Sequence, residues 1–257
     1  MLGNVAMLLL LLCCGLRHAL ADVAGAETQR QPVPRPLGPK PLVFWRSEEL
    51  SLEVPHDWVF NGPIGTVCVA GDDRVGKSTL LSLWAKNLSV EGFEIPEFPA
   101  GHTLQSHTKG LWSALLRAED THLPFHLNLC DSQGLKTTSS SSQLQQWRLH
   151  AANVLVPQVL VYMFKDVLNL DQLRDLARFA HLFQKLGNNS QRSEQLQRFG
   201  RLSPHLIVLV RDDSNLMNGL NGGNISSHLD QVLDSPGFEE DKNLIRQVFR
   251  THEALSL

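Results

Sequence analysis

The stretch GDDRVGKS, residues Gly71–Ser78, decides the expected fold. It follows the apolar run Thr66–Ala70, which is typical of a buried strand, and it leads into Ser78–Lys86, whose apolar residues recur at helical spacing. A glycine-rich turn between a strand and a helix directs backbone N–H groups at an anion, so this order predicts a phosphate-binding loop. The alternative is a glycine-rich turn with an incidental lysine.

The loop supplies several candidate ligands for a nucleoside triphosphate. The lysine of such a loop reaches the β and γ phosphates, and the serine hydroxyl takes a magnesium coordination position. The predicted nucleotide-binding residues of this segment are Gly71, Arg74, Gly76, Lys77, Ser78 and Thr79.

The pattern after the loop predicts an α/β protein. Leu111–Leu116 and Phe125–Cys130 alternate as an antiparallel pair would. Val154–Phe164 and Leu206–Val210 are typical of buried parallel strands, with an amphipathic helix over Asp171–Leu186 between them. We expect a P-loop NTPase three-layer sandwich with a mostly parallel, doubly wound sheet. Two short strands, Leu42–Trp45 and Ser51–Val54, are expected to lead into it.

The N-terminus predicts entry into the secretory pathway. An apolar run over Ala6–Leu16 is followed by Ala19–Ala21, an A-x-A cleavage site, so residues 1–21 are expected to be a signal peptide, with a short signal anchor as the alternative. Residues 22–41, with their closely spaced prolines, predict an extended linker, and the domain is expected over 42–257. The predicted location is secreted or in the lumen of the endoplasmic reticulum. No run reaches the roughly 20 apolar residues of a membrane helix, so no transmembrane segment is expected.

Charge and cysteine content narrow the possible partners. The formal net charge of −3 argues against a nucleic-acid partner. Beyond the signal peptide only Cys68 and Cys130 remain, both in predicted core strands, so buried unpaired thiols are favoured over a bridge between neighbouring strands. The eleven histidines show no zinc-site spacing.

Further candidate ligands follow the other predicted strands, because parallel α/β sheets bind ligands at the carboxyl ends of their strands. Asp131–Gly134 reads DSQG, in which Asp131 would hold Mg²⁺ through water and the Gly134 N–H would meet the γ phosphate. Thr108, ahead of the Leu111 strand, would complete the magnesium shell as a switch residue. Arg211 and Asp212 follow another strand, where a carboxylate can accept two guanine N–H groups that adenine does not offer.

Together these motifs resemble those of the guanylate-binding protein and atlastin branch of large, dynamin-related GTPases. The family pattern GxxRxGKS, QSHTKGxW, DxEG and Arg-Asp is matched here, in order, by Gly71–Ser78, Gln105–Trp112, Asp131–Gly134 and Arg211–Asp212. The resemblance covers about Pro41 to Phe249. It implies GTP hydrolysis with Mg²⁺ and nucleotide-dependent homodimerisation through the GTPase faces.

The resemblance also implies roles for single residues. Arg74 would be an arginine finger supplied in cis, and an arginine inside the phosphate loop is within reach of the phosphates. Ser106 would position the attacking water, Thr108 and Ser78 would coordinate Mg²⁺, and Asp212 would select guanine. Polar-loop bonding, a solvated charge or a turn cap are the alternatives for these residues.

Two departures from the family pattern bear on activity. Gln133 stands where the family has an acidic residue, so hydrolysis is expected to be slow. The chain stops at Leu257, so the last core strand and the helical or membrane segments of the family are expected to be absent, although Ala254–Leu257 would suit a small edge strand. The sequons at Asn87, Asn188 and Asn224 predict glycosylation in a secreted domain.

These observations support two functions of different class. The first is a GTP-binding, slowly GTP-hydrolysing domain in the secretory pathway, with GTP or GDP as its ligand. The second is a pseudo-GTPase that serves as a secreted or lumenal interaction module. ATP hydrolysis is a third possible function, and it is excluded if Asp212 selects guanine over adenine.

Overall fold

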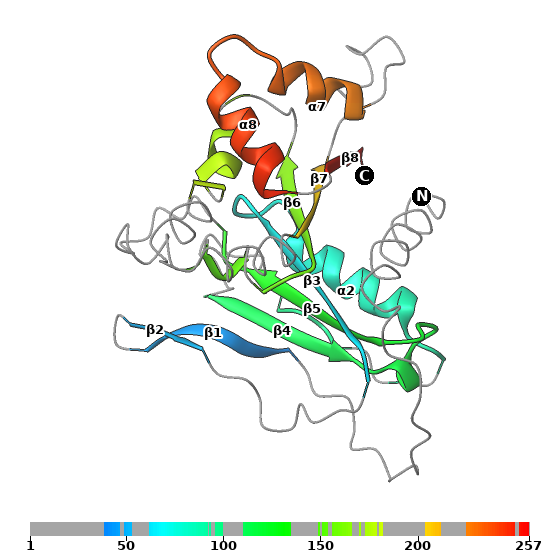
Figure 1. Cartoon of the computed structure of the whole chain (residues 1–257). Coiled ribbons are helices and arrows are strands. Elements are labelled where there is room, and N and C mark those ends of the chain that lie inside the picture. Colours follow the sequence, from blue (N-terminus) through cyan, green and yellow to red (C-terminus); the bar gives the residue numbers. More distant parts are fainter. Residues whose placement is uncertain are drawn as a thin grey trace.

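The computed structural model describes residues 39–46, 49–52, 62–91, 93, 96–99, 110–134, 149, 151–153, 156–165, 170, 173–178, 180–181, 204–211, 225–249 and 252–256. Strands within these ranges form one sheet in the order β2-β1-β4-β5-β3-β6-β7-β8 (Figure 1). The strands are β1 (Lys40–Arg46), β2 (Glu49–Leu52), β3 (Ile64–Gly71), β4 (Leu111–Leu116), β5 (His126–Ser132), β6 (Val159–Lys165), β7 (His205–Arg211) and β8 (His252–Ser256). The helices whose bounds are described are α2 (Lys77–Leu88), α7 (Ile225–Leu233) and α8 (Glu239–Val248), with a 3-10 turn η1 (Ala118–Asp120). Residues 173–178 are also helical, within the helix predicted over Asp171–Leu186.

The sheet is mixed. Strands β5, β3, β6, β7 and β8 run parallel to one another. Strands β4, β1 and β2 add antiparallel pairs on the β5 side, which confirms the antiparallel pair predicted from the sequence and gives the sheet more antiparallel pairing than the expectation of a mostly parallel sheet. The short connection through η1 explains this, because a parallel pairing of β4 and β5 would need a crossover of a dozen or more residues.

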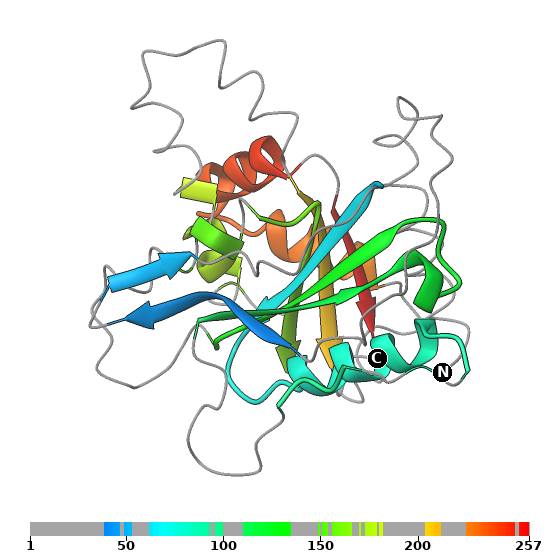
Figure 2. The same ribbon diagram turned by 90° about the horizontal axis from the view of Figure 1, so that it is seen from below.

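The central strand β3 is buried on both faces, which is why its sequence is apolar without alternation. On one face, Cys68 and Ala70 pack in a cluster with residues of α7 and α8. On the other face, Val67 and Val69 pack with residues of α2. Figure 2 shows the sheet from below, with helices on both sides of it. The sheet is therefore the middle layer of the described structure.

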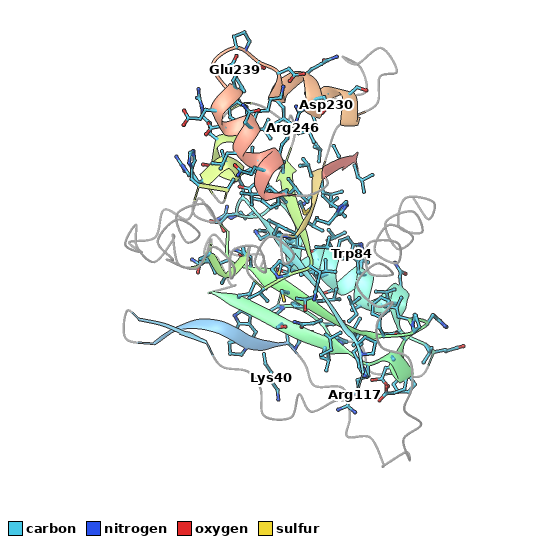
Figure 3. The ribbon with its side chains drawn as sticks, viewed as in Figure 1. Lys40, Trp84, Arg117, Asp230, Glu239 and Arg246 are labelled. Carbon is cyan, nitrogen blue, oxygen red and sulfur yellow. The ribbon has the colours of Figure 1, made fainter. Side chains whose placement is uncertain are left out.

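Helix α2 lies against β3 and β5. It buries Leu81 and Trp84 against the sheet, while Leu83, between them, is 52% exposed. Trp84 can be located on α2 in Figure 3. Since α2 starts at Lys77, this packing fixes the position of the residue that follows the glycine-rich turn.

The end of the chain forms a short strand, as the sequence allows. Strand β8 pairs in parallel with β7, from Leu206 beside His252 to Val210 beside Ser256, so the sheet does have a strand at this edge. The small edge strand foreseen near Ala254 is the one that forms. Its physical cause is the burial of Phe249 and Ala254 in the same apolar cluster as α8, which brings the chain back to β7.

At the other end, β1 begins at Lys40, so Lys40 and Pro41 belong to the sheet and not to the linker expected up to residue 41. The expected signal peptide, residues 1–21, lies outside the described residues. Among the helices that the structure describes, none combines the length and apolarity that a membrane crossing requires.

The two cysteines that the structure describes lie side by side in the sheet. Cys68 on β3 is the register partner of Cys130 on β5, and both are buried free thiols, as predicted. Burial raises the pKa of the Cys68 thiol well above its usual range, and the neighbouring Cys130 adds to that effect. Both residues therefore behave as small apolar core side chains.

Candidate nucleotide-binding site

The glycine-rich turn joins the end of β3 to the start of α2 (Figure 1). Gly71 has φ of 136° and Gly76 has φ of 94°, a region of backbone space that favours glycine. A Cβ on Gly71 would lie 2.1 Å from the backbone oxygen of Met163 on β6. Glycine at position 71 is therefore required both by the turn and by the close approach of β6.

Arg74 lies at the outer side of this turn. Its φ is 61°, which is uncommon for a residue with a side chain, and the residue is exposed. Val75 next to it is buried. Val75 therefore anchors the turn in the core, while Arg74 next to it is exposed.

Lys77 is buried at the first position of α2. Its ammonium donates to the carbonyl oxygens of Asp72, at 2.6 Å, and Gly71, at 3.4 Å. Burial lowers the pKa of Lys77, while the nearby carboxylates of Asp131, Asp73 and Asp72 act in the opposite direction. The lysine thus carries its charge inside the loop, where a phosphate group would compensate it.

Ser78 and Asp131 bring two oxygens together from different elements. The Ser78 hydroxyl, in the first turn of α2, donates to Oδ2 of Asp131 at 2.7 Å. Asp131, near the end of β5, is fully buried. A hydroxyl and a carboxylate are the hard oxygen ligands that Mg²⁺ prefers, so the residues fit a magnesium site. Among the described residues no group of three or more His, Cys, Asp or Glu side chains gathers as a metal site.

Gly134 lies against the phosphate loop. A Cβ on Gly134 would meet Oδ1 of Asp73 at 1.7 Å and the Cα of Asp73 at 2.8 Å, so the position accepts no side chain. The two segments that the sequence predicts to surround the γ phosphate, the glycine-rich turn and the DSQG segment, are therefore in contact.

Gln133 has a structural partner that the sequence does not reveal. Its side-chain oxygen accepts a hydrogen bond from the backbone N–H of Gly110 at 2.9 Å. The backbone N–H of Gln133 donates to the Gly110 carbonyl oxygen at 2.8 Å. These bonds extend the β4–β5 ladder by one pair beyond Leu111 and Ser132. Gln133 thus fastens the residue that precedes β4 to the DSQG segment.

Arg211, the last residue of β7, also reaches the phosphate loop. Its Nη1 donates to the carbonyl oxygen of Val75 at 3.1 Å, across β6. The sequence predicted Arg211 as a nucleotide-binding residue, and the structure places its guanidinium on the loop backbone. No local sequence signal predicts this bond, because it depends on the order of β3, β6 and β7 in the sheet.

The structure therefore gathers one part of the predicted site. Gly71–Thr79, Asp131, Gly134 and Arg211 lie at the same edge of the sheet, where β3, β5 and β7 end. Outside the described residues are Ser106, Thr108, Asp212, Asn188 and Asn224. Asn87, in the last turn of α2, is exposed.

This combination of a mixed α/β sheet, a glycine-rich turn leading into a helix, and a buried lysine beside a serine–aspartate pair defines a P-loop protein. Residues 53–247 match the family described as guanylate-binding protein, N-terminal domain. The chain belongs to this family.

Individual relatives agree with this assignment. Human guanylate-binding protein 4 is 31% identical over 157 residues, which cover 58% of this chain and 23% of the relative. Mouse guanylate-binding protein 6 is 28% identical over 169 residues, covering 64% of this chain and 26% of the relative. Guanylate-binding protein 1 of Chlorocebus aethiops is 27% identical over 157 residues, covering 59% and 25%. The chain thus matches about a quarter of the length of these relatives.

Proposed function

We propose that this chain binds GTP with Mg²⁺ and hydrolyses it slowly to GDP and phosphate. The observation that carries the proposal is the buried Lys77 at the start of α2, next to the Ser78–Asp131 pair. A buried ammonium with a lowered pKa gains from an anion placed beside it. The N–H groups of the first turn of α2, which have no partner within the helix, add a second attraction for phosphate.

The residues divide the work of binding. Lys77 would contact the β and γ phosphates, and the N–H of Gly134 would meet the γ phosphate beside Asp73. Ser78 and Asp131 would hold Mg²⁺, with Thr108 as a further ligand. When bound, Mg²⁺ neutralises charge on the phosphate oxygens. Asp212 would accept the two guanine N–H groups and so select GTP over ATP.

In the reaction, the oxygen of a water molecule bonds to the γ phosphorus while the bond from that phosphorus to the β–γ bridging oxygen breaks. Ser106 would orient the water, and the Arg74 guanidinium would neutralise the charge that develops on the transferring group. Gln133 cannot accept the proton as a carboxylate would, and its side-chain oxygen is bonded to Gly110. This supports slow turnover.

The test is nucleotide binding by the purified protein. A fluorescent GTP analogue is titrated with Mg²⁺ and then displaced by GTP, GDP or ATP. We expect displacement by GTP and GDP and none by ATP, followed by phosphate release that Arg74→Ala reduces by at least about tenfold. Folded protein that binds no guanine nucleotide would overturn the proposal.

The same measurement separates the second candidate function, a pseudo-GTPase acting as an interaction module. Gln133 favours the pseudo-GTPase, because it stands where the family pattern has an acidic residue and its side-chain oxygen accepts a hydrogen bond from the Gly110 N–H. If the wild type binds guanine nucleotides but releases no phosphate, and Arg74→Ala behaves in the same way, the result would support this candidate and contradict catalysis.

We further propose that the domain works in the secretory pathway and forms a homodimer when nucleotide is bound. The apolar N-terminal run supports the first part, and membership of the guanylate-binding protein family supports the second. Sedimentation of the purified protein with and without a non-hydrolysable GTP analogue tests the dimer. A monomer under both conditions would contradict it.

A further inference from the structure

Arg211 makes a contact that reading a base does not require. Its Nη1 donates to the Val75 carbonyl, a residue 136 positions earlier in the chain. To do so, the side chain leaves the end of β7 and passes over β6, which lies between β7 and β3. This bond therefore ties the end of β7 directly to the phosphate loop.

The guanidinium also fills the space beside Gly76. A Cβ on Gly76 would lie 2.8 Å from Nη1 of Arg211 and 3.9 Å from Cε of Met163. Gly76 adopts the left-handed conformation that begins α2, so this is the residue at which the loop turns into the helix. Arg211 therefore holds the loop at its turning point.

The bond has a directional consequence for the backbone. The peptide unit between Val75 and Gly76 is planar and trans, so its C=O and its N–H point in opposite directions. Fixing the Val75 oxygen on Arg211 therefore fixes the direction of the Gly76 N–H, which points to the other side of the loop. In a phosphate-binding loop, such N–H groups are the ligands of the anion.

We infer that Arg211 is a positioning residue for the phosphate loop: it sets the orientation of the Val75–Gly76 peptide so that the Gly76 N–H is held toward the phosphates. This inference rests on the proposed function. It assigns to Arg211 a task distinct from that of its neighbour Asp212, for which base reading is proposed. The segment that reads the base and the loop that holds the phosphates are thereby linked through one side chain.

The first test needs no nucleotide. Amide hydrogen exchange is measured in the purified wild type and in Arg211→Met, Arg211→Lys and Arg246→Met. Arg246 is a matched control, since it lies on α8 beside Asp230 of α7, away from α2 (Figure 3). We expect faster exchange of residues 72–78 in Arg211→Met, an intermediate rate in Arg211→Lys, and no change there in Arg246→Met. Unchanged loop exchange in a folded Arg211→Met protein would overturn the inference.

The second test uses GTP, GDP and ATP as probes. A hydrogen bond from a charged group justifies an expectation of at least about tenfold weaker binding of both GTP and GDP in Arg211→Met, with the preference for GTP over ATP retained and with partial recovery in Arg211→Lys. A lost preference for GTP over ATP, with loop exchange unchanged, would mean that Arg211 reads the base and would overturn the inference. If the wild type binds none of the three, the proposed function fails, and the exchange experiment still decides whether Arg211 holds the loop.

Discussion

At the scale of single residues, the site contains two charged groups, the Lys77 ammonium and the Asp131 carboxylate, whose burial is energetically unfavourable. Lys77 is buried with its ammonium on the carbonyls of Asp72 and Gly71, and Asp131 is fully buried with the Ser78 hydroxyl on its carboxylate. Each charged group has partners, but an isolated buried charge remains costly. Both groups would gain from a bound magnesium–phosphate complex, so their substitution should affect binding more than folding.

Lys77→Ala should therefore abolish nucleotide binding. The variant loses the only ammonium that the described residues place inside the loop, and we expect at least about a hundredfold weaker displacement of a fluorescent GTP analogue. Lys86→Ala is the matched control, since Lys86 is exposed in the last turn of the same helix. Equal affinity in the two variants would contradict a phosphate role for Lys77.

The lowered pKa of Lys77 also predicts a pH dependence of stability without nucleotide. Between that lowered pKa and the ordinary value of 10.5, the unfolded chain binds more protons at this residue than the folded chain does. The free energy of unfolding should therefore rise with pH through this window relative to Lys77→Met, in which this titration is absent. Urea denaturation of both proteins at several alkaline pH values measures the difference. A difference that falls as the pH rises would contradict the burial effect.

The Gln133–Gly110 bond predicts a difference between two substitutions. Gln133→Ala leaves the N–H of Gly110, a buried residue, without its side-chain acceptor, which should lower the free energy of unfolding by about 1–3 kcal/mol. Gln133→Glu retains an acceptor and should lose less. Urea denaturation of both variants measures the difference. Equal losses of unfolding free energy would show that the side-chain acceptor for the Gly110 N–H does not contribute to stability.

At the scale of elements, α2 carries the loop and anchors it in the core. Its inward face contributes Leu81 and Trp84 to the same cluster as Val67 and Val69 of β3. The helix that starts at Lys77 is thus fixed to the strand that ends at Gly71. A substitution that weakens the packing of α2 against β3 should therefore make the glycine-rich turn between them more mobile.

Two neighbouring residues of α2 test this arrangement. Trp84 is 5% exposed and Leu83 is 52% exposed. Trp84→Ala should lower the free energy of unfolding by about 3–5 kcal/mol because it removes a buried aromatic side chain. Leu83→Ala should change it by no more than about 0.5 kcal/mol, as is typical of surface positions. Similar losses in urea denaturation would mean that the helix faces are assigned wrongly.

The sequence predicts those elements whose signals are local. Strand β3 and helix α2 follow from an apolar run, a glycine-rich turn and helical spacing, and the pairing of β4 with β5 follows from alternation around a short connection. The sequence allows a small edge strand near Ala254 but does not predict that it pairs with β7, because this pairing depends on the burial of Phe249 and Ala254 in the cluster that contains α8. Local patterns contain no information about such packing.

The site shows the same division. Gly71, Gly76, Lys77 and Ser78 are predicted from one short motif, and the structure brings them to Asp131 and Gly134. The bonds from Gln133 to Gly110 and from Arg211 to Val75 could not be predicted, because each depends on which strands are neighbours. Sequence therefore predicts the groups that would touch the ligand better than the groups that hold them.

At the scale of the whole molecule, a secretory location predicts a modified protein. Asn87 is exposed on α2, and its sequon is available to the glycosylation machinery during synthesis. Expressed with its own N-terminus in secreting cells, the chain should gain electrophoretic mobility after enzymatic removal of N-glycans, and Asn87→Gln should carry one glycan fewer. Identical mobility before and after the enzyme would contradict the secretory proposal.

The direction of β4 gives the molecule a mechanical property. Because β4 runs against β5, the chain enters the sheet at Gly110 at the same edge where β3 and β5 deliver the loop and Asp131. A displacement of Gly110 along β4 would strain the hydrogen-bonded ladders that join β4 to β5 and to β1. The β1–β2 ribbon, at the outer end of the sheet, is thus hydrogen-bonded to the strand that begins at this edge.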